Sequence, residues 1–213
     1  MPVRKIPKNF THITGIVASS KAIGEAGFEG RLEYEHLLLL AFAPWVATFE
    51  VQPVRIPWRD QNGKEHWYTI DIRVNDIDEN VKPLLGEVKP RAILKEDWAE
   101  LKPKFRAAIR YANQGQCRFK LITDREIRTQ YLTNVRFLLP FVRRGADSEM
   151  QQTVMEALRK GTESTPRRLM NDLASDLWKQ AEYLPALWYL IGTFQVCADL
   201  DQPLTMDVRV CLP

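Results

Sequence analysis

The sequence LLGEVKP at residues 84–90 is the most informative part of this chain of 213 residues. Apolar residues dominate it, which favours a β-strand over 84–88 that is buried in a sheet. Strand alternation places Glu87 and Lys89 on one face and Val88 on the other. Charges in such a strand usually have a partner or a function. We therefore take Glu87 and Lys89 as candidate functional residues.

A third charged residue, Asp71, belongs to the preceding predicted strand at 67–74. If the two strands are neighbours, Asp71, Glu87 and Lys89 converge at one point. Two carboxylates can hold a hard divalent cation such as Mg²⁺, and a lysine ammonium can orient water and offset charge that develops on a phosphate. The pattern favours phosphodiester hydrolysis. The alternative is a cross-strand ion pair, worth about 0–1 kcal/mol if exposed.

The surrounding residues predict an α/β domain. Strands are expected at 46–51, 67–74, 84–88 and 118–122. The turn at 60–63 joins the first two as a hairpin, and the third is the next neighbour. Helices are expected at 30–42 and 95–114. Pro44 ends the first, while Pro103 kinks or divides the second before Gly115 ends it. The order predicts a sheet with a helix packed on each side.

The first predicted helix adds a carboxylate to this set. Glu33 lies one turn before Leu37, so the spacing aims Glu33 along the apolar face of the helix. Glu35 is close to it and is an alternative for the same role. Gln52 ends the first predicted strand, where it either supports the site from its border or merely precedes Pro53, which stops the strand.

The composition changes at the polar, glycine-containing segment 143–147, which we interpret as a domain boundary. The expected domains are 1–144 and 145–213. The first begins with a basic arm that contains Arg4, Lys5 and Lys8. Helices are expected in the second at 148–160, 166–178 and 185–191, followed by a hairpin of 194–198 and 206–210. Three short helices and a terminal hairpin follow the order of a winged helix.

Composition and charge exclude several classes of protein. With 45% hydrophobic and 27% charged residues, the chain is not of the disordered, collagen-like or disulfide-scaffold class. A disulfide framework is not expected from three scattered cysteines, Cys117, Cys197 and Cys211. Zinc chemistry is not expected from His12, His36 and His66, which lack ligand spacing.

The charge and the apolar stretches bear on partners and location. The formal net charge of +3 permits a nucleic-acid partner without requiring one. The longest apolar stretch, 37–47, contains Pro44 and is too short to span a bilayer. We therefore expect no membrane partner and a cytoplasmic location.

Several blocks of the chain match one family in their order and spacing. They are Thr14-Gly15 with Ser19 and Lys21, FEGRLE at 28–33, VATF at 46–49, Gln52-Pro53, YTID at 68–71, GEVKP at 86–90, FKLITD at 119–124, Ile127-Arg128 and Asn134. They resemble the TnsA endonuclease subunit of heteromeric cut-and-paste transposases. The resemblance implies a restriction-endonuclease-like catalytic domain with its D…(D/E)xK pattern, followed by a winged-helix-like domain.

The resemblance also implies roles for the candidate residues. The helix glutamate of the family falls on Glu33, its metal-binding aspartate on Asp71, its variable acidic or amide position on Glu87 and its catalytic lysine on Lys89. Glu33, Asp71, Glu87 and the backbone carbonyl of Val88 would hold the metal.

Two positions depart from the family. Its serine before the glutamate is Gly30 here, and its proline before the aspartate is Ile70. Neither change removes a catalytic group, so an active enzyme is still expected.

The activity implied is that of a Mg²⁺-dependent DNA endonuclease, with Mn²⁺ as the alternative metal, that cuts the 5′ strands at transposon ends. An integrase-like transposase subunit would cut the 3′ ends, and an ATP-binding regulator would be a further partner, in the bacterial cytoplasm at the nucleoid. Two alternatives stay open. One is a stand-alone nuclease of the same fold, such as a phage head-completion or restriction-type protein, and the other is a non-catalytic DNA-binding assembly subunit.

Overall fold

The computed structural model describes residues 13–60, 62–161 and 163–213. The chain divides into two compact units, Met1–Arg128 and Thr129–Pro213. The basic residues of the predicted arm (Arg4, Lys5 and Lys8) and His12 lie outside the described residues. Among the described helices, none has the length and apolarity that crossing a bilayer requires.

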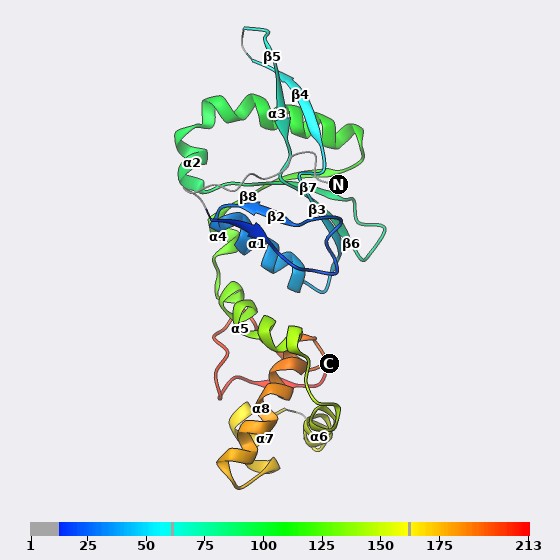
Figure 1. Cartoon of the computed structure of the whole chain (residues 1–213), viewed down its shortest axis with the longest axis vertical. Coiled ribbons are helices and arrows are strands. Elements are labelled where there is room, and N and C mark those ends of the chain that lie inside the picture. The colour runs from blue at the N-terminus through cyan, green and yellow to red at the C-terminus, as the bar shows by residue number, and fades with distance from the viewer. Residues whose placement is uncertain (1–12, 61, 162) are drawn as a thin grey trace. The chain divides into compact units, whose positions relative to one another are not determined.

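A four-stranded mixed sheet forms the centre of the first unit (Figure 1). Its strands lie in the order β3 (Val46–Val51), β6 (Ile72–Asp76), β7 (Leu84–Val88) and β8 (Arg118–Ile122). The pairs β3–β6 and β6–β7 are antiparallel, and β7–β8 is parallel. The predicted α/β class and the neighbourhood of the three strands β3, β6 and β7 are therefore confirmed.

Helices cover both faces of this sheet, as predicted (Figure 1). Helix α1 (Arg31–Phe42) contacts β3 and β7, and it follows a small antiparallel sheet of β1 (Thr14–Ile16) and β2 (Gly27–Glu29). Helix α3 (Trp98–Gln114) packs on the other face, where its Ala108 shares an apolar cluster with Leu85 of β7. The short helix α4 (Asp124–Ile127) follows β8.

The predicted strand 67–74 is wrong in one respect, because the chain forms two strands there. β5 (Glu65–Thr69) pairs with β4 (Arg55–Arg59), and β6 pairs with β3. The turn at 60–63 therefore joins β4 to β5. The four strands form one long antiparallel ribbon that is interrupted in the middle.

We call this break the ribbon interruption. It consists of residues 52–54 in one segment of the ribbon and residues 70–71 in the opposite segment. These residues lie between the last residue pair of β3–β6 and the first residue pair of β4–β5. Three residues face two, as in a β-bulge, which bends a ribbon and is common beside active sites. The Gln52 N–H donates to the carbonyl of Asp71 at 2.8 Å, and the Ile70 N–H donates to that of Val54 at 3.1 Å. Gln52 has a φ of 50°, in the left-handed region.

The helix predicted at 95–114 begins earlier and divides at a different residue. A separate helix α2 (Arg91–Glu96) precedes α3, and Pro103 lies inside α3. The break is at Asp97, whose N–H donates to the Ile93 carbonyl and whose own carbonyl accepts from the Leu101 N–H, both at 2.9 Å. Asp97 therefore ends one helix and begins the next.

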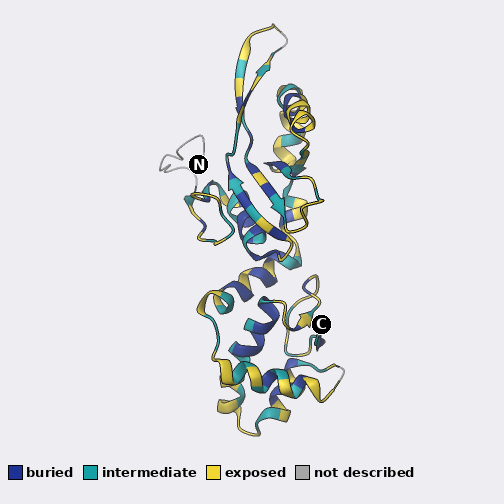
Figure 2. Cartoon of the chain, turned by 90° about the vertical axis from the view of Figure 1, so that its right-hand side faces the viewer, coloured by how far each residue is buried: buried dark blue, intermediate teal, exposed yellow. Residues whose placement is uncertain are grey.

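Four helices and a two-residue strand pair form the described part of the second unit. They are α5 (Gln130–Arg144), α6 (Ser148–Arg159), α7 (Pro166–Leu173), α8 (Leu177–Gly192), β9 (Cys197–Ala198) and β10 (Val210–Cys211). α8 contacts the other three helices. Its C-terminal half is buried around Leu187 and Leu190, as the dark segment in Figure 2 shows.

Several boundaries in this unit differ from the predictions. α7 ends before residue 178 and α8 begins before residue 185, because the Asp176 side chain caps a new helix by accepting from the Lys179 N–H at 3.1 Å. Both strands of the predicted hairpin are wrong in extent: the strand predicted at 194–198 is reduced to β9, which starts at Cys197, and the strand predicted at 206–210 is reduced to β10, which starts only at Val210.

The division between the two units comes earlier in the chain than our expected boundary after residue 144. α5 belongs to the second unit and packs against α8. On α5, the side-chain amide of Asn134 donates to the carbonyls of Leu200 and Gln202 at 2.8 and 2.7 Å. These bonds tie α5 to the C-terminal segment.

The two edges of the central sheet are covered differently. Beside β3, the Phe49 N–H donates to the Lys21 carbonyl at 2.9 Å, and the Ile23 N–H donates to the Phe49 carbonyl at 2.8 Å. At the other edge, β8 exposes two cationic residues, Arg118 and Lys120.

Gly86 in β7 is packed so tightly that we expect Gly86→Ala to destabilise the protein. A Cβ there would lie 2.7 Å from Ile122 Cδ1 and 2.8 Å from Ile72 Cγ2. Overpacking of this kind typically costs about 1–3 kcal/mol. Urea denaturation of both proteins measures the change in the free energy of unfolding. Gly115→Ala is the control, because its Cβ would meet nothing closer than 3.5 Å. Equal stability of Gly86→Ala and the wild type would contradict this packing.

Candidate active site

Asp71 lies at the ribbon interruption, directly before β6. Its Oδ2 accepts a hydrogen bond from the Val88 N–H at 2.8 Å. This bond holds the carboxylate against the end of β7. The two strands therefore bring Asp71 beside Glu87 and Lys89, as the sequence predicted.

Glu87 and Lys89 contact each other on one side of β7. Lys89 Nζ lies 2.9 Å from Glu87 Oε1, and the Tyr68 hydroxyl donates to Glu87 Oε2 at 2.6 Å. Glu87 is only 3% exposed, so both oxygens of a buried carboxylate have a partner. The structure does contain an ion pair, the alternative that we considered, but it joins Glu87 of β7 to Lys89 directly after the same strand rather than crossing between strands.

Glu33 and Glu35 have different surroundings on α1. Glu33 Oε2 accepts from the Glu29 N–H at 2.8 Å, and its side chain shares a pocket with Asp71. Glu35 is 1% exposed and forms ion pairs with Arg31 at 2.9 Å and with Arg128 at 2.6 Å. Glu33 is therefore the glutamate that faces Asp71, whereas Glu35 joins two arginines.

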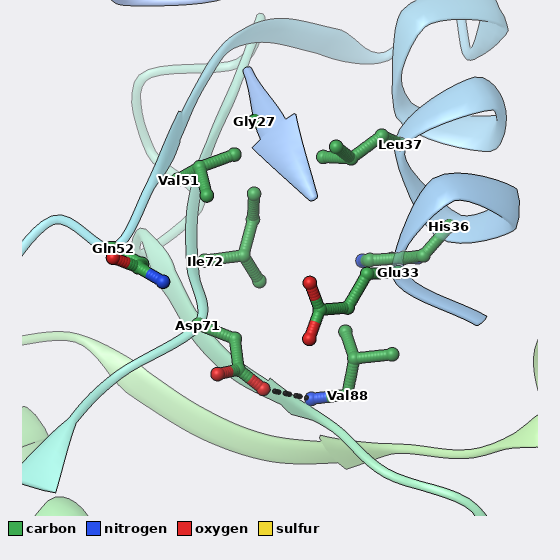
Figure 3. Close-up of a pocket in the computed structure, with 9 residues that line it drawn as sticks. All are labelled: Gly27, Glu33, His36, Leu37, Val51, Gln52, Asp71, Ile72 and Val88. Carbon is green, nitrogen blue, oxygen red and sulfur yellow. Dashed lines mark hydrogen bonds between the residues drawn. The ribbon is translucent and has the colours of Figure 1, made fainter. Parts of the chain in front are cut away.

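The pocket between α1 and the end of the sheet is drawn in Figure 3, where the Glu33 carboxylate points toward Asp71. Val88 and His36 line it as well. Gln52 lines the pocket from the end of β3, and its Oε1 is buried without a hydrogen-bond partner among the described residues. An unpaired buried acceptor costs about 1–3 kcal/mol, so this oxygen is an energetically unfavourable feature at the border of the pocket.

Asp71 also lines a second, open cleft of about 580 Å³. Tyr68, Glu87 and Lys89 line this cleft but not the pocket of Glu33. Asp71 is thus the residue that the pocket and the cleft share, with Glu33 on one side of it and Glu87 on the other.

Burial and mutual repulsion disfavour the charged forms of the carboxyl groups. Burial raises the pKa of Asp71 well above its usual value, and the negative charges of Glu87 and Glu33 raise it further. Burial also raises the pKa of Glu33 to about 6, against the lowering effect of the Glu29 N–H. Carboxylates in this condition are stabilised by a bound cation.

Lys89 stays protonated at neutral pH. Burial lowers its pKa, but the charges of Glu87, Asp71 and Glu33 outweigh burial, so the net pKa is raised. Burial and the adjacent Glu87 raise the pKa of Tyr68, so its hydroxyl stays a donor. Lys89 is therefore suited to stabilising negative charge rather than to removing a proton.

The donors around Asp71 fit a hard divalent cation. They are carboxylate oxygens, which Mg²⁺ and Mn²⁺ prefer, contributed by Glu33 and Asp71 in the pocket and by Glu87 in the cleft. Among the described residues, no three His, Cys, Asp or Glu side chains form a ready-made metal cage. Asp71 is instead bonded to the Val88 N–H, and Glu87 is bonded to Tyr68 and Lys89.

The histidines of the described structure have separate environments. His36 is buried, and burial lowers its pKa to about 4. His66 lies 2.8 Å from Asp60 Oδ2 and stacks on Trp58. Neither arrangement resembles a zinc site.

Sequence reasoning missed Tyr68. One continuous strand over 67–74 would place Tyr68 and Asp71 on opposite faces, because they are an odd number of residues apart. The ribbon interruption resets the alternation and turns the hydroxyl toward Glu87. Pro53 was the available signal: by stopping the first strand well before the turn at 60–63, it leaves room for a second pair of strands.

Two family models match the chain. One, described as TnsA-like endonuclease N terminal, matches residues 43–124, which include Gln52, Asp71, Glu87 and Lys89. The other, described as TnsA endonuclease C terminal, matches residues 126–208. No curated protein matches the sequence. Since the two models follow one another over most of its length, the chain belongs to the TnsA family of transposase endonuclease subunits.

Proposed function

We propose that this chain is the metal-dependent DNA endonuclease subunit of a heteromeric transposase and cuts the 5′ strands at transposon ends. The observation that carries the proposal is Asp71, a half-buried carboxyl group with a raised pKa that adjoins Glu33 in a pocket and Glu87 with Lys89 in an open cleft. Asp71 is disfavoured as an anion and lies beside the accessible cation Lys89. Strongly perturbed groups of this kind in a cleft are typical of functional sites.

Glu33, Asp71, Glu87 and the backbone carbonyl of Val88 would hold the metal, with Mg²⁺ as the expected ion and Mn²⁺ as the alternative. A bound divalent cation supplies a Lewis acid for the phosphate and lowers the pKa of bound water. Gln52 would support the site from its border, where it lines the pocket of Glu33 and Asp71.

Lys89 would provide a fixed positive charge in the cleft. Its ammonium is held 2.9 Å from Glu87 Oε1, and its side chain is 26% exposed, so a phosphate oxygen can reach it. There it would offset the negative charge that develops during hydrolysis. Tyr68 keeps the Glu87 carboxylate oriented by donating to its other oxygen.

The second unit would dock a partner protein. It carries none of the candidate catalytic residues, and we propose that its part 145–213 is a winged-helix-like region that binds an ATP-binding regulator. An integrase-like transposase subunit would join the assembly on the transposon ends, at the bacterial nucleoid. Leu177 and Trp178 at the start of α8 are 76% and 82% exposed, which fits a protein contact.

We expect Asp71→Asn or Lys89→Ala to lower 5′-strand cutting by at least about 10²-fold, because each removes a charge that acts on the reacting phosphate. The assay is a gel that separates the strands of a transposon end, with the transposase subunit and Mg²⁺ present. Circular dichroism verifies the fold of each variant. Wild-type cutting by either one would refute the assignment and favour a non-catalytic assembly subunit.

Glu33→Gln and Glu35→Gln form a matched pair on one helix. Glu33→Gln should lose cutting with its fold intact. Glu35→Gln should cut like the wild type below its melting temperature, yet lose about 1–3 kcal/mol of unfolding free energy, because it weakens ion pairs with Arg31 and Arg128. The opposite pattern in these two assays would assign the metal site to Glu35.

In metal-free solution, Glu33→Gln should gain stability over the wild type as the pH rises from 4.5 to about 6, and the gain should level off above that. The reason is that folded Glu33 retains its proton where the unfolded chain has already released it, so rising pH favours unfolding of the wild type. The measurement is thermal denaturation at several pH values.

The stability of Glu33→Gln must be compared with that of the wild type at each pH, because His36 changes the stability of both proteins in the opposite direction as the pH rises. Its pKa is lowered to about 4 in the folded state, so its own contribution to stability increases with pH over the same range. A difference between Glu33→Gln and the wild type that does not change with pH would show that the folded pKa of Glu33 is ordinary.

Replacing both Leu177 and Trp178 by Ser should weaken binding of the ATP-binding regulator at least about 10-fold, since two exposed apolar side chains at an interface centre can each contribute more than 1 kcal/mol. Calorimetry or surface plasmon resonance measures the affinity. Thermal stability should not change, because both side chains are exposed in the described structure. Undiminished affinity would place the docking surface elsewhere.

A further inference from the structure

The open cleft at Asp71 extends beyond the candidate catalytic residues. Arg55 of β4, Trp67 and Thr69 of β5, and Leu101 and Lys104 of α3 also line it. The β4–β5 hairpin and α3 therefore form a wall of the cleft next to Lys89. The function proposed above gives these wall residues no task.

Arg55 and Trp67 form a stacked pair on this wall. The Arg55 guanidinium lies 5.3 Å from the centroid of the Trp67 ring, a cation–π distance, and Trp67 is 53% exposed. Within the described part of the chain, no carboxylate forms an ion pair with Arg55. An indole ring thus orients a planar cation whose donors are open to a ligand, and such a guanidinium suits bidentate contact with phosphate.

Lys104 is the second cation of the wall. Its ammonium lies 5.8 Å from the centroid of Trp58 and 2.9 Å from Glu100 Oε1, one helical turn away. Glu100 is 73% exposed at its side chain, so this pair is weak and its carboxylate can turn to solvent. A phosphate can therefore replace Glu100 as the partner of Lys104.

The distribution of charge in the cleft indicates the ligand. The cations lining it are Arg55, Lys89 and Lys104, and the anions are Asp71 and Glu87. Both anions belong to the proposed metal site, where a divalent cation would neutralise them. The wall then presents cations without further acidic residues to the ligand, as a site for a phosphodiester backbone does.

We propose that Arg55 and Lys104 bind backbone phosphates of the DNA strand that enters the cleft, with Trp67 positioning the Arg55 guanidinium. The inference rests on the proposed function, since it assigns the substrate contacts of the same site. Such contacts position the strand without reading its bases. The β4–β5 hairpin is thereby a DNA-positioning element of the endonuclease.

The test measures binding of a fluorescent DNA duplex of arbitrary sequence to the full chain by anisotropy, over a series of salt concentrations with Mg²⁺ present. Arg55→Ala and Lys104→Ala should each weaken binding about 3- to 10-fold at low salt and lower the slope of log K against log salt by about 1. Trp67→Ala should weaken binding less, and Trp67→Phe should restore it, because a ring again supports the guanidinium.

Two controls match these variants in charge. Lys102→Ala lies on the same helix as Lys104, and Arg73→Ala lies on β6; both side chains are exposed and neither lines the cleft. Both should bind like the wild type. If Arg55→Ala and Lys104→Ala keep the wild-type affinity and slope, or lose no more than the controls, the inference is overturned.

The DNA-cutting assay with the transposase subunit and Mg²⁺ distinguishes a failure of this inference from a failure of the proposed function. Normal cutting with unchanged binding by the wall variants would remove the inference and leave the endonuclease assignment standing. Binding that depends on Arg55 and Lys104 in a wild type that never cuts would keep the wall contacts and remove the assignment.

Discussion

The rest of the first unit depends on the ribbon interruption, where residues 52–54 face 70–71. On one side of it the two segments pair as β3 and β6 within the central sheet, and on the other side they pair as β4 and β5. The extra residue bends the ribbon. As a result, Asp71 meets the end of β7, Gln52 enters the pocket of Glu33, and the hairpin becomes a wall of the cleft. One irregularity in pairing thus positions both sides of the candidate site.

The site is electrostatically costly in its metal-free form. Asp71 and Glu33 have raised pKa values, Gln52 Oε1 has no partner among the described residues, and Glu87 depends on Tyr68 and Lys89 for its two bonds. A fold usually removes such groups or pairs them, because each costs free energy. Their concentration around Asp71 is typical of a site whose stability is completed by a ligand.

Sequence reasoning succeeded where one local pattern determines the outcome. The two-residue period of a strand predicted that Glu87 and Lys89 lie opposite Val88. The period of a helix predicted the direction of Glu33. The structure contains both arrangements. Sequence reasoning failed where the structure depends on how two distant segments of the chain pair with each other. No single segment contains the information that residues 52–54 oppose 70–71, so the predicted strand 67–74 was undivided and Tyr68 was not identified as a partner of Glu87. Asp176 is a residue type that often caps helices, but the apolar residues on both sides of it gave no indication of the helix boundary.

The way in which the two edge strands of the central sheet are protected affects the solubility of the protein at high concentration. A free strand edge is a template on which a second copy can add its own strand, and this is a common start of aggregation. Here the backbone beside Phe49 is occupied by the Lys21–Ile23 segment, and β8 presents the side chains of Arg118 and Lys120. Both edges therefore discourage strand addition between copies, so concentrated samples of this protein should not form β-linked fibres through its central sheet.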